Sequence, residues 1–131
     1  MNWKLIFSLS MLGLAMAIAT VYFFPSTVEP YFWLLVFIVS AWRIAQVCSS
    51  NYFWHGLSLS LVNCVWITTI HIILYTTYIN LHPQEAAMME KMPVPSAPRL
   101  MMALMGPVIG AVSGIILGLF SLIASRMVRK Y

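Results

Sequence analysis

Four long apolar runs dominate the hydrophobic pattern of the chain, and short stretches rich in polar residues and proline separate them. An apolar run of about 20 residues is long enough for an α-helix that crosses a bilayer. The runs cover residues 5–24, 31–47, 54–81 and 101–125. The third run is longer than a bilayer requires, so we expect it to tilt or to protrude. The pattern predicts an all-α integral membrane bundle of four transmembrane helices, forming one transmembrane domain over residues 1–131.

The composition of the chain supports this class of protein. Only 8% of the residues are charged and 62% are hydrophobic, whereas about 25% of the residues of a soluble domain are charged. We therefore expect the lipid bilayer to be the main partner and the cell membrane (inner or plasma) to be the location. The formal net charge is +4, but no basic stripe with interleaved aromatic residues is present. Nucleic acid is therefore not an expected partner.

The basic residues between and beyond the runs predict the orientation of the protein. Five basic residues are predicted to lie on one side of the bundle, namely Lys4, Arg43, Arg126, Arg129 and Lys130. Two, Lys91 and Arg99, are predicted to lie on the other side. Because the side richer in Lys and Arg is usually cytoplasmic, both termini are predicted to lie in the cytoplasm.

The first apolar run has a second interpretation. It follows a basic start and contains small residues at Ala17 and Ala19, as a secretory signal peptide does. Cleavage after about residue 19 therefore stays open beside the spanning helix, although the apolar run continues through residues 20–24.

Glycine recurs at every fourth position in the last apolar run. The four positions are Gly106, Gly110, Gly114 and Gly118. We call them the glycine line. A glycine inside a helix is less favourable than alanine by about 1 kcal/mol, but small residues at this spacing let a second helix approach closely. The expected partner is the first run, where Gly13 and Ala17 are also four residues apart. A homo-oligomer across the same line, or a conduction path beside it, are the alternatives.

Polar side chains inside the apolar runs are concentrated in the third run. Asn63 and His71 are eight residues apart and share a broad helix face with Ser60, Tyr75 and Tyr78. Such groups form hydrogen bonds between helices, or they line a path for a small substrate, or His71 acts as a proton relay. No Asp or Glu lies within the four runs, which argues against proton-coupled transport.

The segment between the third and fourth runs combines proline and methionine. Pro83 is expected to end the third helix or to begin a new one, and a short interfacial helix in this outer loop would reach about residue 92. Thioethers select Cu(I), and the candidate ligands are Met88, Met89, Met92, Met101, Met105 and His82. The alternative is that the methionines fill irregular apolar contacts, so the spacing alone assigns no metal site.

From residue 82 to residue 125, the order "HPQEAAMM…SAPRLMM…MGPVIGAVSGIILG" resembles small bacterial four-span membrane proteins of a family without assigned function. The size and layout of the whole chain also match that family. The resemblance implies a fold and a location, and it supplies no catalytic or binding residues.

The sequence offers no arrangement typical of an enzyme. It contains no acid–base pair, no nucleophile beside a base and no metal-binding constellation at usable spacing, so we expect no catalytic residue and no cofactor. The first functional hypothesis is a non-enzymatic protein that packs against itself or into a larger membrane complex. The second is a small oligomeric transporter or channel-like protein that uses the polar face of the third helix. The third is an extracytoplasmic accessory protein that binds Cu(I).

Overall fold

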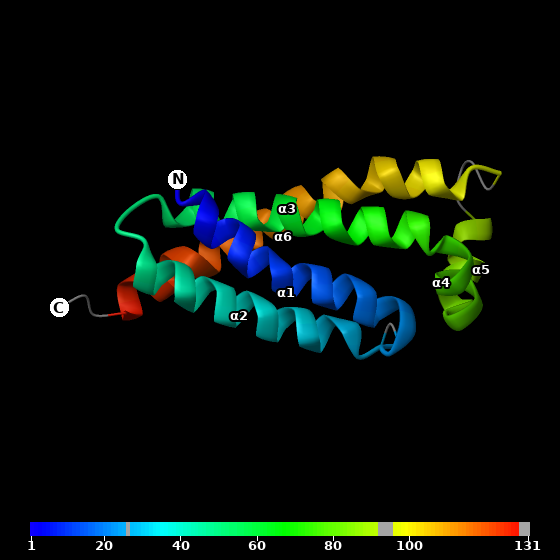
Figure 1. Ribbon diagram of the computed structural model, residues 1–131, viewed down its shortest axis with the longest axis horizontal. Helices are drawn as coiled ribbons and strands as arrows, with labels where there is room; N and C mark the ends of the chain where they lie inside the picture. The colour runs from blue at the N-terminus through cyan, green and yellow to red at the C-terminus, as the bar shows by residue number, and fades with distance from the viewer. Residues whose placement is uncertain (26, 92–95, 129–131) are drawn as a thin grey trace.

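A computed structural model describes residues 1–25, 27–91 and 96–128, which form helices and connecting turns without a strand (Figure 1). The helices are α1 (Trp3–Tyr22), α2 (Glu29–Val47), α3 (Tyr52–Ile73), α4 (Tyr75–Leu81), α5 (Pro83–Glu90) and α6 (Pro98–Met127). Four of them, α1, α2, α3 and α6, are long and apolar enough to cross a membrane. The predicted all-helical class is therefore confirmed, and so is the presence of four helices long and apolar enough to cross a membrane.

The helix starts follow from local chemistry. The side chain of Asn2 accepts a hydrogen bond from the backbone N–H of Leu5 and so caps α1. Helix α2 begins at Glu29 because Pro30 is suited to the first helical turn and a carboxylate there interacts favourably with the helix dipole. The second span therefore begins two residues earlier than predicted. It contains a carboxylate, which the sequence analysis had excluded from every span.

The third apolar run does not form one helix. Helix α3 ends at Ile73, and α4 follows after Leu74 in a different direction, so that α4 and α5 lie across one end of the bundle (Figure 1). The predicted continuous span over residues 54–81 is therefore wrong. At the break, Arg99 Nε donates a hydrogen bond to the carbonyl oxygen of Ile72 at 3.2 Å, and its guanidinium carbon lies 4.9 Å from the centroid of the Tyr75 ring. A side chain that binds a helix carbonyl is a recognised cause of such bends.

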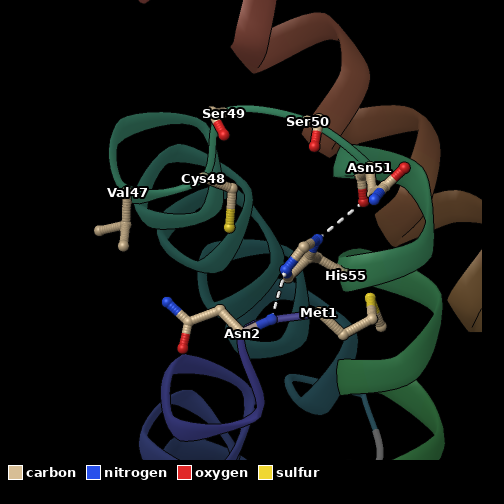
Figure 2. Close-up of a pocket in the computed structure, with 8 residues that line it drawn as sticks. All are labelled: Met1, Asn2, Val47, Cys48, Ser49, Ser50, Asn51 and His55. Atoms are coloured by element: carbon tan, nitrogen blue, oxygen red, sulfur yellow. Dashed lines mark hydrogen bonds between the residues drawn. The ribbon is translucent and has the colours of Figure 1, made fainter.

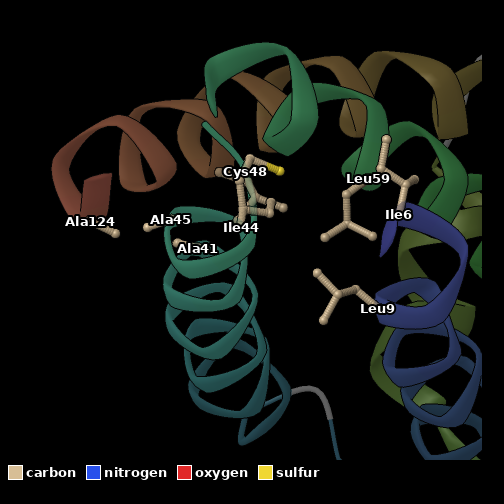
Figure 3. Close-up of a cluster of buried hydrophobic side chains, with 9 residues drawn as sticks. Ile6, Leu9, Ala41, Ile44, Ala45, Cys48, Leu59 and Ala124 are labelled. Atoms are coloured by element: carbon tan, nitrogen blue, oxygen red, sulfur yellow. The ribbon is translucent and has the colours of Figure 1, made fainter. Parts of the chain in front are cut away.

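A cluster of buried side chains joins the four long helices near the turn between α2 and α3 (Figure 3). Its members are Ile6, Leu9, Ala41, Ile44, Ala45, Cys48, Leu59, Leu117 and Ala124. The cluster holds one half of the bundle closely packed. Helices α2 and α3 have few contacts with each other, and a cavity lies between them at the end of the bundle near α4 and α5.

Helix α6 packs most extensively on α3 and also on α2, whereas α1 packs mainly on α3. The glycine line therefore faces α3, and the predicted pairing of the first and fourth spans is wrong. Gly13 of α1 lies against Asn63 of α3, and Ala17 is fully buried. Because α3 occupies the glycine line within one chain, that line is not available for a homo-oligomer.

Helix α3 presents its own line of small residues to the glycine line. Gly56, Ser60, Cys64 and Thr68 follow one another at every fourth position and run antiparallel to the glycines. A Cβ atom on Gly110 would lie 2.7 Å from the Cβ of Cys64, and one on Gly56 would lie 2.8 Å from the Cα of Gly118. The backbones of α3 and α6 are thus in direct contact at Gly56, a glycine that the sequence analysis did not single out.

Candidate ligand-binding cavity

A cavity of about 820 Å³ lies between α2, α3 and α6, and residues of α4 and α5 complete it at the end away from the buried cluster. Helix α3 contributes a polar wall. Helix α2 contributes an aromatic wall with one carboxylate. Gly106 and Gly110 also line the cavity, because the absence of side chains at these positions leaves space beside the contact with α3.

Two polar side chains of the α3 wall are satisfied by backbone carbonyls of α6. Ser60 Oγ donates to the carbonyl oxygen of Gly110 at 3.1 Å, and Cys64 Sγ donates to that of Gly106 at 2.7 Å. Polar groups are costly at membrane depth unless they find such partners. These two bonds therefore stabilise the contact between α3 and α6, and they match the predicted interhelical role of polar residues in this span.

Asn63 is different, because its carboxamide is not paired. The residue lines the cavity and is only 2% exposed, yet neither Nδ2 nor Oδ1 has a hydrogen-bond partner among the described residues. A buried polar group without a partner destabilises a fold by about 1–3 kcal/mol. Neither polar atom is accessible, and a Cβ atom on Gly13 of α1 would overlap Asn63 Oδ1. The carboxamide therefore belongs to the contact between α1 and α3 and presents no donor or acceptor to the open part of the cavity.

His71 lies further along the same wall and has a defined tautomer. Its Nε2 is 3.0 Å from Thr20 Oγ1, and the Thr20 hydroxyl donates to the carbonyl oxygen of Ala17, also at 3.0 Å. Since the Thr20 hydroxyl already donates its hydrogen to Ala17, the Thr20 oxygen accepts a hydrogen bond from His71 Nε2–H, and His71 Nδ1 is left as an acceptor. The ring of Tyr78 stacks on that of His71 at 4.5 Å. Both residues line the cavity, whereas Tyr75 of the predicted polar face contacts Arg99 instead.

Tyr78 keeps its phenolic proton in this setting. Burial raises the pKa of the Tyr78 phenol, and the nearby carboxylates of Glu85 and Glu29 raise it further. The phenol is therefore a hydrogen-bond donor at the α4 end of the cavity.

The α2 wall joins a carboxylate to a row of aromatic rings. Glu29 Oε1 accepts a hydrogen bond from Trp33 Nε1 at 3.2 Å. The Trp33 ring meets that of Phe37 edge to face at 6.3 Å, and Phe37 meets Phe120 of α6 in the same way at 6.4 Å. Among the described residues that line the cavity, Glu29 is the only acid, and none is Lys or Arg.

Sequence reasoning missed Glu29 because it precedes the apolar run. A signal was nevertheless present. A glutamate directly before a proline is typical of a first helical turn, and its spacing of four residues from Trp33 places both on one helix face.

Methionines line the end of the cavity that α5 and the start of α6 form. They are Met88, Met101, Met102 and Met105, so three of the candidate copper ligands share one cavity. The side chain of Met89 and the whole of Met92 lie outside the described residues. No group of three His, Cys, Asp or Glu side chains in the described part of the chain is placed to hold a metal ion. Copper binding by the methionines stays a prediction.

His82 does not line this cavity and does not join the methionines. It is buried, with Nδ1 2.9 Å from the carbonyl oxygen of Tyr78 and Nε2 2.9 Å from that of Phe24. Its ring also stacks on the Tyr78 ring at 4.5 Å. With both ring nitrogens next to carbonyl oxygens, His82 connects α4 to the segment after α1 and offers no free nitrogen to a metal ion.

A smaller pocket of about 400 Å³ lies at the opposite end of the bundle, beside the turn between α2 and α3 (Figure 2). His55 is its central side chain. Nδ1 lies 2.8 Å from the carbonyl oxygen of Asn51, and Nε2 accepts the backbone N–H of Asn2 at 3.0 Å. Asn51 has a positive φ of 56°, which asparagine tolerates better than most residues. The polar groups shown here are used to hold the turn against the start of α1.

No protein family model, no curated protein and no solved structure matches this chain. The resemblance to a family of small bacterial four-span proteins therefore stays a prediction, and the functional argument rests on the cavity.

Proposed function

We propose that the protein is a four-span integral membrane protein of the cell membrane, with both termini in the cytoplasm and α4 and α5 at the opposite face of the bilayer. The lengths and hydropathy of α1, α2, α3 and α6 support this arrangement. Lys4 lies in the first turn of α1, Arg43 near the end of α2 and Arg126 near the end of α6. These helix ends lie at one end of the bundle, and the end of α5, with Lys91, and the start of α6, with Arg99, lie at the other (Figure 1). The side richer in basic residues is then cytoplasmic. Arg129 and Lys130, which add to that excess, lie outside the described residues.

In this bilayer the protein binds a small amphipathic molecule in the cavity between α2, α3 and α6, and it acts as a small transporter rather than as an enzyme. The observation that carries the proposal is the cavity of about 820 Å³ itself, which has a polar wall on α3 that includes His71 and an aromatic wall on α2 that includes Glu29. Ligand sites are typically apolar cavities of about 300–1,000 Å³ with a few polar groups. The aromatic wall on α2 suits the apolar part of a ligand, and the polar wall on α3 suits its polar part.

The cavity changes the order of the functional hypotheses. A role as a packing or complex subunit was first suggested by the glycine line, but α3 of the same chain covers that line. The hypothesis of a small transporter that uses the polar face of the third helix gains the cavity as its binding site. Assembly with another protein, or with a second copy of this chain, remains a prediction, and it would use a surface other than the glycine line.

Equilibrium binding of a neutral amphipathic probe tests this function. The protein is placed in lipid nanodiscs and titrated with naphthylmethanol, and nanodiscs without protein measure the partition of the probe into lipid. We expect saturable binding of one probe per chain. Ser113→Phe places a ring in the cavity, so it should weaken binding about tenfold or more.

The matched control is Val112→Phe, at the neighbouring position of α6. Val112 is 57% exposed and does not line the cavity, so this variant should bind as the parent protein does. The proposal is wrong if the parent shows only lipid partition, or if Ser113→Phe and Val112→Phe bind equally well.

A further inference from the structure

We infer that the ligand of this cavity is an organic cation, a molecule with an ammonium group and an apolar body. The inference rests on the proposed function and names its ligand class. The features that point to a cation are Glu29, the aromatic rings beside it and the absence of Lys and Arg from the described lining.

Glu29 supplies the negative charge. It lines the cavity, and one of its carboxylate oxygens accepts the Trp33 indole N–H. That bond fixes the carboxylate on the aromatic wall and leaves further lone pairs for an ammonium donor. The cavity therefore has one carboxylate whose charge no Lys or Arg of its described lining balances.

The rest of the cavity complements the apolar body of a cation. Trp33, Phe37 and Phe120 form a continuous row of rings that leads away from Glu29. Aromatic faces attract ammonium groups, by about 0.5–2 kcal/mol depending on how far the pair is desolvated. The methionines at the α5 end add flexible, polarisable side chains that adapt to different ligand shapes.

An anionic ligand fits this cavity poorly. Glu29 would repel it, and the described wall holds no guanidinium or ammonium group to receive it. His71 does not compensate, because its Nε2–H already bonds Thr20 and its Nδ1 is an acceptor. The carboxamide of Asn63 does not compensate either, because its polar atoms are buried and Oδ1 faces Gly13 of α1.

The test uses three probes with one ring system: naphthylmethylamine, which is a cation at neutral pH, naphthylmethanol, which is neutral, and naphthoate, which is an anion. Binding to the protein in nanodiscs of phosphatidylglycerol is measured by equilibrium dialysis, with empty nanodiscs subtracted. We expect the amine to bind about tenfold more tightly than the alcohol, and naphthoate not to bind. Glu29→Gln should abolish the preference for the amine over the alcohol, a loss of about tenfold, since glutamine removes the charge but keeps an oxygen acceptor for Trp33.

The control is Glu90→Gln, which removes an exposed carboxylate of α5 that does not line the cavity, and it should keep the preference for the amine. If the alcohol binds and the amine binds no better, or if Glu29→Gln keeps the preference, the cation inference is wrong and the binding function stands. If neither probe binds saturably, the binding function itself fails. Nanodiscs that also contain phosphatidylethanolamine separate two sources of the ammonium group. Competition by this lipid identifies a lipid headgroup as the natural cation, and unchanged affinity identifies a free amphipathic amine.

Discussion

The substitution Gly56→Ala tests the contact between α3 and α6 where their backbones meet. A Cβ atom on Gly56 would lie 2.8 Å from the Cα and N atoms of Gly118 and from the carbonyl carbon of Leu117. Carbon atoms in contact prefer separations of about 3.5–4.0 Å. Because all three neighbours are backbone atoms, no side chain can rotate away, and the two helices must separate by roughly 1 Å.

The magnitude follows from two opposing effects. Extra atoms in a close contact typically destabilise a protein by about 1–3 kcal/mol. Alanine favours a helix over glycine by about 1 kcal/mol, but this gain largely cancels because a membrane-spanning segment stays helical when its neighbours separate. The expected loss of unfolding free energy for Gly56→Ala is therefore about 1–3 kcal/mol.

The matched control is Gly106→Ala on the glycine line. The Cβ atom there would meet first the hydroxyl of Thr68, a side-chain group that can rotate, so the expected loss is below about 1 kcal/mol. Reversible unfolding in mixed micelles with increasing sodium dodecyl sulfate, followed by circular dichroism, gives both free energies. The reasoning is refuted if Gly56→Ala is as stable as the parent protein, or if both variants lose the same amount.

Three further substitutions test other parts of the structure in the same unfolding assay. Asn63→Leu removes an unpaired buried amide, so we expect a gain in stability of about 1–3 kcal/mol. A loss of stability would mean that the amide has a partner. Arg99→Met removes the bond to the Ile72 carbonyl and should destabilise the protein by about 1–2 kcal/mol, and an unchanged midpoint would contradict the role of Arg99 at the bend. His82→Phe keeps the stacking but leaves the Phe24 carbonyl without its donor, so it should cost about 1–3 kcal/mol. Stability equal to the parent's would show that water satisfies this carbonyl.

The long helices of the fold were predictable, because each corresponds to a long and almost uninterrupted run of apolar residues. The apolar runs predicted four helices, because a helix satisfies the backbone N–H and C=O groups of a segment of about 20 apolar residues within that segment. The bend after Ile73 was not predictable, because neither Gly nor Pro lies there and Arg99, which binds the adjacent carbonyl, comes from a distant part of the chain.

The partner of the glycine line was missed for a different reason. Ser60, Cys64 and Thr68 are small as well as polar, and the sequence analysis considered their polarity rather than their four-residue spacing with Gly56. For the cavity, the sequence indicated Asn63 and His71 on one polar wall. The opposite wall depends on how α2 packs against α6, which no local pattern encodes.

Photolabelling tests most directly whether the cavity is the ligand site. The protein in nanodiscs is irradiated with aminomethylbenzophenone, and the labelled residues are identified by peptide mass spectrometry, with and without excess naphthylmethylamine. We predict labels on lining residues such as Phe37, Met105 and Ile109, and their loss when the competitor is present. Labels that fall on Val112 and Ile115 of α6, which do not line the cavity, and that persist with the competitor would contradict the account.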